Sequence, residues 1–409
     1  MTRNFKKDFP IFAARPDLVY LDNTATTQKP ALVIDGVAEY LRTGYANIHR
    51  GSYELSEISE KLYRDSKKIV AKHIGAENWR EVIYTSNSSY ALNLLAQSIW
   101  RTGLLKAWDT VLVSIVEHHA NIVPWLILKQ DYGINVEFVW VTENFDLDYN
   151  DFRDRLTSNV KIVALTQVSN TTGQIFDISN VASLLSVRYG KDKPLLIVDG
   201  SQSVPHIWVD VKKLWCDALF FTGHKIFADS GIGVLWARED LLHRLKPIFS
   251  WGGAIGQVGQ EHFTHSTQLP DKFEPWTPNL SGAVSLLKAF EYLEGIGGYA
   301  VLEAKEKELT KYTLEKFKNI SALKLIWSTS TDNRLWVFTF VIEWIHSFDI
   351  SDYLAEYGIC IRAGQHCAEP FLKEIWYNHT CRMSLHLYNT REDVDRFFTT
   401  LEQAITALC

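Results

Sequence analysis

Short apolar segments alternate with helical patterns through much of the chain, and this alternation constrains the fold more than any other feature of the sequence. Three runs are predominantly apolar over the length of a buried strand: Lys161–Thr166 (KIVALT), Leu195–Asp199 (LLIVD) and Ala218–Thr222 (ALFFT). Further strands are expected at Glu81–Thr85, Thr110–Ser114, Val136–Val139 and Gly233–Ala237, and helices at Ser89–Trp100, Ile122–Asp131 and Ile178–Tyr189. Apolar strands that alternate with helices are typical of a mostly parallel sheet covered on both faces, so the sequence predicts an α/β fold.

A cluster of chain-breaking residues, Gly295 to Gly298, marks a change in this pattern. Beyond it we expect a long charged helix, two apolar runs and a closing helix, at Tyr299–Phe317, Leu335–Glu343, Cys381–Tyr388 and Arg391–Leu408. The prediction is an N-terminal arm at 1–24 that packs on the small domain, a large domain at 25–292, and a smaller α/β domain at 293–409.

Composition excludes several classes of protein. Of 409 residues, 46% are hydrophobic and 22% charged, which argues against a disordered chain or a coiled coil. The net charge of -6 provides no overall basic field, so no nucleic-acid partner is expected. No apolar run approaches the roughly 20 residues that span a bilayer, and the first residues lack the apolar core of a secretory signal. Five cysteines without a CxxC motif favour free thiols, and we expect a cytoplasmic protein.

Polar residues that follow two of the apolar runs indicate the chemistry. Asp199 ends LLIVD, and Lys225 comes shortly after ALFFT. Ligands of open α/β sheets bind at the carboxyl ends of the strands, so this Asp and this Lys are expected in one cleft. Pyridoxal phosphate requires such a pair, because a lysine forms the Schiff base and an aspartate keeps the pyridine nitrogen protonated. A structural Asp–Lys ion pair is the alternative that spacing alone leaves open.

Other positions could complete a pyridoxal phosphate site. Ser88 and Ser89 stand at a turn from strand to helix, where hydroxyls and free amides bind phosphate or merely cap the helix. His118 of VEHHAN follows a strand and could stack on the cofactor ring, although such a histidine is more often structural. Asn170 of VSNTTG could bond the phenolate oxygen. No third ligand at metal-like spacing accompanies His118 and His119, so no metal is expected.

Several long motifs are those of one enzyme family. They are Tyr20–Pro30 (YLDNTATTQKP), Ala46–Ser56 (ANIHRGSYELS), Glu117–Trp125 (EHHANIVPW), Val198–His206 (VDGSQSVPH), Thr222–Leu235 (TGHKIFADSGIGVL), Ile361–Pro370 (IRAGQHCAEP) and Cys381–Thr390 (CRMSLHLYNT). On these motifs nearly the whole chain resembles the class V, fold-type I pyridoxal-phosphate enzymes, and within them the group II (SUF-type) cysteine desulfurases and selenocysteine lyases. The resemblance implies a mostly parallel seven-stranded sheet covered by helices, a smaller α/β domain that carries an active-site cysteine, and a homodimer with shared active sites.

The resemblance also implies a role for each residue that matches a family motif. Lys225 corresponds to the Schiff-base lysine, Asp199 to the partner of the pyridine nitrogen, and His118 to the residue that stacks on the ring and helps proton transfer. Bonds to the phenolate and phosphate oxygens are implied for Gln202, Asn170, Ser88, Ser89, Thr222, His224 and, from the neighbouring subunit, Thr277. The substrate carboxylate would be bound by Arg382 as a bidentate fork, with Arg362 and Asn170 also lining the substrate site.

Cys367 decides which reaction the resemblance implies. It lies in AGQHCAEP, which we interpret as a loop, beside His366 and Arg362, two residues that favour the thiolate. In the family this cysteine attacks the sulfur of substrate L-cysteine, so that alanine leaves and a persulfide remains for an acceptor protein. An inert loop thiol is the alternative. The thiols beside apolar runs are interpreted as buried packing groups: Cys216, Cys360 and Cys381.

The chain departs from the family pattern near the expected active site. Asn87-Ser88-Ser89 replaces Gly-Thr-Thr and is followed by Tyr90 in place of an acid. In the loop before the cysteine Ala363 replaces Thr and Gln365 replaces His, and Trp276 replaces a Gly before Thr-Pro-Asn. The substrate preference, the acceptor and the pathway, iron–sulfur cluster assembly or a specialised one, therefore stay open. Two other hypotheses remain: a selenocysteine or cystine lyase, or another lyase or transferase, on the same fold, and a cofactor-binding protein without turnover.

Overall fold

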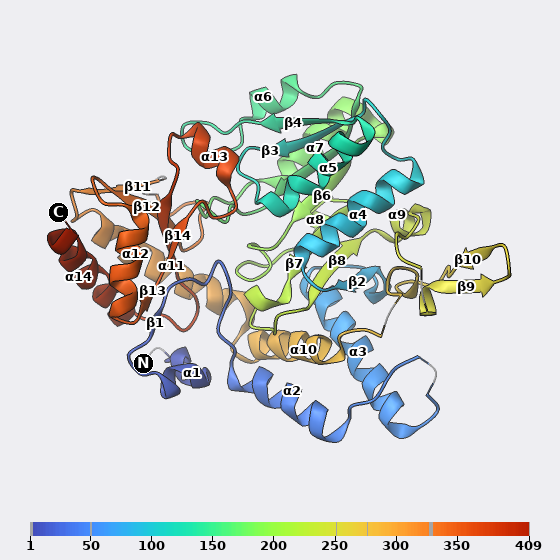
Figure 1. Cartoon of the computed structure of the whole chain (residues 1–409), viewed down its shortest axis with the longest axis horizontal. Coiled ribbons are helices and arrows are strands. Elements are labelled where there is room, and N and C mark those ends of the chain that lie inside the picture. Colours follow the sequence, from blue (N-terminus) through green and yellow to red (C-terminus); the bar gives the residue numbers. More distant parts are fainter. Residues whose placement is uncertain (1–2, 50, 251, 276, 327–329, 409) are drawn as a thin grey trace.

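A seven-stranded sheet forms the centre of the larger part of the molecule, in the order β2-β8-β7-β6-β5-β3-β4 (Figure 1). The computed structural model describes residues 3–49, 51–250, 252–275, 277–326 and 330–408, so Trp276 lies outside the described residues. The strands are β2 (Val82–Thr85), β3 (Thr110–Ser114), β4 (Asn135–Val139), β5 (Val160–Thr166), β6 (Leu195–Asp199), β7 (Ala218–Thr222) and β8 (Gly233–Ala237). β8 runs against its neighbours β2 and β7, and the remaining described pairs are parallel. The predicted α/β fold with a mostly parallel sheet is confirmed.

Successive side chains of the sheet enter two separate cores. In β5, Ile162 and Ala164 belong to a core with α4, α5 and α9, whereas Val163 and Leu165 belong to a core with α3, α7 and α10. This division follows from the two-residue period of a strand and explains why these strands are apolar throughout. The helices are α3 (Glu54–His73), α4 (Ser88–Thr102), α5 (Val123–Tyr132), α7 (Ile178–Tyr189), α9 (Glu239–Arg244) and α10 (Leu280–Gly295), with short helices α6 (Tyr149–Asp154) and α8 (Val211–Leu214).

Three helices lie outside the strand–helix alternation from which the fold was predicted. α2 (Ala31–Thr43), α3 and α10 pack against one another below the sheet in Figure 1. A hairpin of β9 (Ile255–Val258) and β10 (Phe263–His265) projects from the molecule at the end opposite the C-terminal part (Figure 1). The larger part of the molecule therefore contains these elements in addition to the seven strands and three helices that the sequence pattern indicated.

A four-stranded antiparallel sheet, β11-β12-β15-β14, forms the second part of the molecule. Its strands and helices are β11 (Leu323–Leu325), β12 (Val337–Ile342), β14 (Arg362–Gly364), β15 (Thr380–Ser384), α11 (Gly298–Phe317), α12 (Ser347–Glu356), α13 (Glu369–Glu374) and α14 (Arg391–Leu408). α10 ends at Gly295 and α11 begins at Gly298, while the domain division at residue 293 stays a prediction. In the described part of the chain, no helix has the length and apolarity to cross a membrane.

The N-terminal segment lies along this second part. β1 (Val19–Tyr20) pairs in parallel with β13 (Ile359–Cys360), after the short helix α1 (Pro10–Ala14). Lys6 Nζ lies 2.7 Å from Asp393 Oδ1 of α14. Asp22 forms a single parallel bridge with Ser384 at the end of β15. The segment therefore adds its backbone to the C-terminal part before the chain enters α2.

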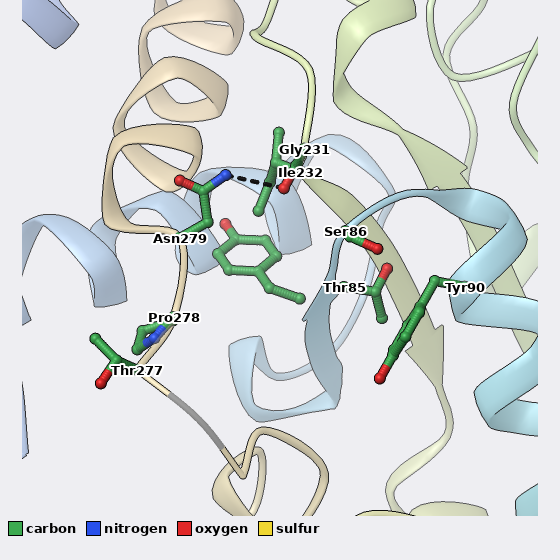
Figure 2. Close-up of a pocket in the computed structure, with 9 residues that line it drawn as sticks. Thr85, Ser86, Tyr90, Gly231, Ile232, Thr277, Pro278 and Asn279 are labelled. Atoms are coloured by element: carbon green, nitrogen blue, oxygen red, sulfur yellow. Dashed lines mark hydrogen bonds between the residues drawn. The ribbon is translucent and has the colours of Figure 1, made fainter.

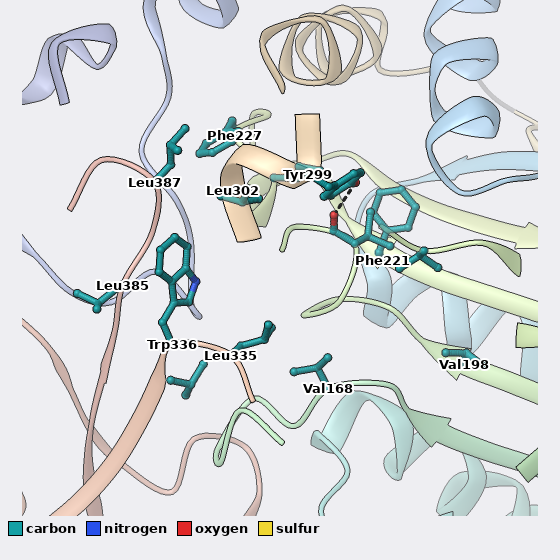
Figure 3. Close-up of a cluster of buried hydrophobic side chains, with 14 of the residues drawn as sticks. Val168, Val198, Phe221, Phe227, Tyr299, Leu302, Leu335, Trp336, Leu385 and Leu387 are labelled. Atoms are coloured by element: carbon teal, nitrogen blue, oxygen red, sulfur yellow. Dashed lines mark hydrogen bonds between the residues drawn. The ribbon is translucent and has the colours of Figure 1, made fainter. Parts of the chain in front are cut away.

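One buried apolar cluster extends from the large sheet into the second part (Figure 3). It includes Val198 of β6 and Phe221 of β7, together with Tyr299 of α11 and Trp336 just before β12. The Tyr299 hydroxyl also donates to the backbone oxygen of Val204 at 2.9 Å. Burial of apolar surface between the two parts fixes β12 and β15 beside the carboxyl ends of the large sheet.

Candidate active site

The carboxyl ends of four parallel strands lead to one cluster of polar residues. Asp199 ends β6, Lys225 follows β7, His118 follows β3, and Asn170 follows β5. Arg382 of β15 reaches the cluster from the second sheet, where its Nη1 donates to the backbone oxygen of Asn170 at 3.0 Å. The charge of Lys225 acts on the pKa of both Asp199 and His118. The structure therefore brings these five residues of the sequence prediction together.

Lys225 and Asp199 form the centre of the cluster. Burial lowers the pKa of Lys225 to about 8, with the Asp199 charge acting in the opposite direction. Asp199 is buried, and burial raises its pKa, although the Ser201 backbone N–H donates to Asp199 Oδ1 at 2.8 Å and favours the carboxylate. A lysine with a lowered pKa holds a larger fraction of free amine, the nucleophilic form, than an exposed lysine does.

His118 is a neutral ring with a defined tautomer. Burial, followed by the charges of Lys225, His119 and Arg382, lowers the pKa of His118 to about 3. Its Nδ1 accepts the backbone N–H of Ala120 at 3.0 Å, so the ring proton is on Nε2. A neutral ring with one N–H can lie against a flat ligand and still hold a proton at a defined atom.

Glu117, which the sequence analysis did not single out, holds the turn that carries His118. It is fully buried and bonded to Ser114 Oγ at 2.5 Å, Asn121 Nδ2 at 2.7 Å and the Thr166 backbone N–H at 2.9 Å. Burial raises the pKa of Glu117 to about 8, and these three bonds act in the opposite direction. The bond to Thr166 holds the turn to the end of β5. The only sign of this role in the sequence was the presence of an acid in EHHAN.

Two side-chain amides predicted to bond the phenolate oxygen each use one N–H on the protein backbone. Gln202 Nε2 donates to the Thr24 backbone oxygen at 3.0 Å, and Asn170 Nδ2 donates to the His366 backbone oxygen at 2.7 Å. An amide nitrogen has two N–H groups, so each retains one for a ligand. Thr24, which comes from the N-terminal segment, was not predicted to position Gln202.

The predicted phosphate residues lie at the ends of β2 and β7, two strands that β8 separates. Ser88 and Ser89 begin α4, whose N-cap Asn87 accepts the Tyr90 backbone N–H at 2.8 Å. Thr222 ends β7, and its buried Oγ1 has no hydrogen-bond partner among the residues that the structure describes. Gly233 of β8 allows the Asn87 backbone to approach β8 closely, because a Cβ at residue 233 would lie 2.4 Å from the Asn87 backbone carbon.

His224 and Thr277 occupy different surroundings. Burial, together with the charges of Lys225 and Lys29, lowers the pKa of half-buried His224 to about 4. Thr277 is exposed and lines a pocket of about 370 Å³ with Tyr90 and Asn279 (Figure 2). Asn279 Oδ1 caps α10 at Gly282, while its Nδ2 donates to the Gly231 backbone oxygen at 2.9 Å. The segment that carries Thr277 is therefore anchored where α10 begins.

Cys367 stands exposed on a strained turn. His366 and Cys367 have φ of +54° and +55°, a left-handed conformation that residues with a side chain seldom adopt. The turn is held from the large part: His119 N–H donates to the Cys367 backbone oxygen at 2.8 Å, and Asn170 bonds His366. Of the other thiols, Cys216 and Cys381 are buried, as predicted for packing residues, whereas Cys360 is half-buried.

The two arginines predicted to line the substrate site share one carboxylate. Arg362 makes two hydrogen bonds to Asp22, at 2.7 and 3.1 Å, and is nearly half exposed. Arg382 is buried and lies 3.5 Å from the same carboxylate. Among the described residues, no group of three or more His, Cys, Asp or Glu side chains could hold a metal ion.

The model of the class-V aminotransferase family matches residues 19–397 of the chain. The chain belongs to this family. Its mostly parallel seven-stranded sheet is that of a fold-type I enzyme, in agreement with the resemblance inferred from the motifs.

Similar proteins of this class extend the match over the full length of the chain. A probable cysteine desulfurase of a Synechocystis species is 35% identical over 98% of this chain and 94% of its own length. The solved structure of an apo cysteine desulfurase from Thermococcus onnurineus superposes with a TM-score of 0.92, at 32% identity over 100% of this chain and 99% of that one. An S-sulfonic acid form of a cysteine desulfurase from Escherichia coli has a TM-score of 0.89, at 29% identity over 99% and 98%.

Proposed function

We propose that this class-V enzyme is a pyridoxal phosphate-dependent cysteine desulfurase, which converts L-cysteine to L-alanine and holds the released sulfur as a persulfide on Cys367. Relatives named cysteine desulfurase align with nearly the whole chain, so the support does not come from a shared fragment. One observation carries the proposal: the exposed Cys367 stands on a strained turn that the Asn170 side chain and the His119 backbone N–H hold against the carboxyl ends of the large sheet.

The residues present fit pyridoxal 5'-phosphate. Thr222 Oγ1 is buried without a hydrogen-bond partner among the described residues, and such an atom is costly unless a ligand such as the phosphate satisfies it. Asp199 would pair with the ring nitrogen, and Lys225 would bond the cofactor aldehyde. The phosphate and phenolate oxygens would be held by Ser88, Ser89, Thr222, His224, Asn170 and Gln202. When bound, the cofactor withdraws electrons from the α-carbon of the substrate.

Two residues act on the substrate around its α-carbon. Arg382 binds the carboxylate, because its buried Nε has no partner among the described residues and its planar guanidinium matches a carboxylate. Lys225, with a pKa of about 8, can take the α-proton as a free amine and return a proton as an ammonium group. The neutral ring of His118 holds its own proton on Nε2 and covers one side of the site.

Cys367 carries out the sulfur transfer. Its thiolate attacks the substrate sulfur, so that an S–S bond forms while the bond between that sulfur and the β-carbon breaks. The electron pair of the broken bond stays on the β-carbon, which takes a proton, and alanine is released. The sulfur remains on Cys367 as a persulfide and the carbon is reduced, so no external oxidant is required. Because Cys367 is exposed, an acceptor protein can reach the persulfide.

A homodimer with shared sites is part of the proposal. Thr277 is exposed, so a partner subunit can reach it. Exposed apolar side chains also gather on the helices α2 and α3: Leu32, Ile34, Leu41, Leu55 and Ile58. Such a group of exposed apolar residues is typical of a protein interface. A cytoplasmic location and a role in iron–sulfur cluster assembly stay predictions from the resemblance.

Incubation of the cofactor-loaded enzyme with L-cysteine tests the proposal. We expect alanine and a persulfide on Cys367 in equal amounts during the first turnover, measured by amino-acid analysis and protein mass. Cys367→Ser should form no persulfide, and its rate of alanine release should fall by more than about tenfold, because a hydroxyl is not ionised at neutral pH. Cys360→Ser is the matched control, because Cys360 is half-buried and lies outside the turn; this variant should still form both alanine and the persulfide. Unchanged alanine release from Cys367→Ser would favour a lyase that needs no protein thiol.

A further inference from the structure

Two arginines lie directly opposite each other at the proposed substrate site. Arg362 of β14 and Arg382 of β15 are partners in the antiparallel register. Like charges in this position repel, and the closest described carboxylate is that of Asp22, which contacts both. Asp22 is brought there by its bridge to Ser384. The sequence motif LDN gave no indication that its acid would meet two arginines from the other end of the chain.

The carboxylate of Asp22 is divided unequally between the two guanidinium groups. Both of its oxygens accept from Arg362, at 2.7 and 3.1 Å, in the geometry of a strong bidentate pair. Its contact with Arg382 Nη2, at 3.5 Å, lies at the limit of a hydrogen bond. Arg382 Nη1 is used by the Asn170 backbone oxygen, and its buried Nε has no partner among the described residues. Nε of Arg382 therefore has a donor left for a ligand carboxylate, and Nη2 is only weakly engaged.

We propose that Asp22 is a specificity-determining residue, which neutralises Arg362 so that the site offers one guanidinium with unused donors, that of Arg382, to an amino acid with a single carboxylate. This inference rests on the proposed function, because it takes Arg382 as the carboxylate-binding residue. Asp22 acts through Arg362, whose charge lies near the Cys367 thiol. An amino acid with a second carboxylate on its side chain would meet an arginine that is already occupied.

A purely structural counter-ion makes a different prediction. If Asp22 only prevented repulsion between the two arginines, its removal would weaken the binding of all amino acids together. A residue that limits positive charge instead changes the ratio of affinities between ligands with one and with two carboxylates. L-Alanine and L-aspartate are suitable probes, since they share the α-carboxylate and amine and differ by one side-chain carboxylate.

The test compares the Kd of L-alanine and of L-aspartate for the cofactor-loaded protein, measured by calorimetry. Asp22→Asn keeps the shape of the side chain and removes its charge, so Arg362 becomes available for a second carboxylate. We expect the affinity for L-aspartate to rise about tenfold relative to that for L-alanine, as for one added charge-assisted contact. The gain should disappear in Asp22→Asn/Arg362→Gln. Asp151→Asn, which breaks the pair between Asp151 of α6 and Arg155 just after that helix, is the matched control and should leave the ratio unchanged.

Three results would overturn the inference: an unchanged affinity ratio in Asp22→Asn, a gain that survives the loss of Arg362, or an equal gain in Asp151→Asn. If Asp22→Asn fails to fold, the Kd values of the wild-type protein provide the test. Tighter binding of L-aspartate than of L-alanine to the wild-type protein would contradict an Arg362 that Asp22 already occupies. Failure of the proposed function appears separately, as a wild-type protein that releases no alanine from L-cysteine. The affinity ratio does not depend on turnover.

Discussion

Replacement of Lys67 by methionine tests a buried ion pair on which the position of one wall of the Thr277 pocket depends. Lys67 of α3 is fully buried, and its Nζ lies 2.6 Å from Glu274 Oε1. The Tyr63 hydroxyl donates to Glu274 Oε2 at 2.6 Å, and the backbone N–H of Tyr84, which lines that pocket, donates to Oε1 at 2.5 Å. Burial lowers the pKa of Lys67, and the charge of Glu274 acts in the opposite direction.

The magnitude follows from what remains after the ammonium group is removed. Lys67→Met leaves the Glu274 carboxylate buried with neutral donors alone, and the loss of one partner of a buried pair costs about 3–5 kcal/mol. The Val82 backbone oxygen, which accepts from Lys67 Nζ at 2.8 Å, also loses its donor. We therefore expect the free energy of unfolding to fall by about 4 kcal/mol. Lys67→Met/Glu274→Gln should recover part of this loss, because the unpaired buried charge is gone.

Urea unfolding of the cofactor-loaded protein, followed by tryptophan fluorescence, measures the effect. Lys61→Met is a control on the same helix, since Lys61 pairs with Asp65 at the surface and its loss should cost no more than about 0.5 kcal/mol. A Lys67→Met variant as stable as Lys61→Met would refute the reasoning. So would a double variant no more stable than Lys67→Met, because the cost would then not come from an unpaired carboxylate.

Other predictions concern the cofactor site. Lys225→Ala should abolish turnover with little loss of stability, and borohydride reduction of the wild-type holoenzyme should place the pyridoxyl group on Lys225; label on another lysine would contradict the assignment. In cofactor-free protein, the reaction of Lys225 with an amine-directed reagent should rise through about pH 8 and level off above it, since the amine is protonated below its pKa. A profile that rises only near pH 10, as for an exposed lysine, would exclude the lowered pKa. Dilution into monomers should weaken cofactor retention if Thr277 contacts the phosphate of a partner, whereas a monomer that retains cofactor fully would contradict shared sites.

The local sequence pattern predicts elements but not the elements they meet. α7 and α14 have the predicted bounds, Ile178–Tyr189 and Arg391–Leu408, because apolar periodicity, caps and breakers act over a few residues. The central strands are equally clear, since burial on both faces leaves a continuous apolar run. The antiparallel direction of β8 is a property of its connection to β7 and has no counterpart in its own residues.

A strand end gives a local signal for the site residues that follow it, whereas a contact between distant segments gives none. Asp199 and Lys225 follow from the rule that ligands bind at the carboxyl ends of strands. The contact between Asp22 and Arg362 joins residues 340 positions apart, and the pair Lys67–Glu274 joins residues 207 apart. The residues around Asp22 and around Glu274 contain no pattern from which their basic partners could be predicted. Such contacts depend on how the two parts of the molecule pack, which no short window of sequence contains.

The same distinction explains why the departures near Cys367 leave its position intact. Ala363 and Gln365 differ from the family pattern, but neither supplies the bonds that hold the turn to the large part. Those bonds come from the backbone oxygens of His366 and Cys367, which accept from Asn170 Nδ2 and the His119 N–H. A backbone oxygen is present whatever side chains surround it. The strained turn, and with it the placement of the exposed thiol, therefore depends on Asn170 and the His119 backbone, while Ala363 and Gln365 can alter what approaches the thiol.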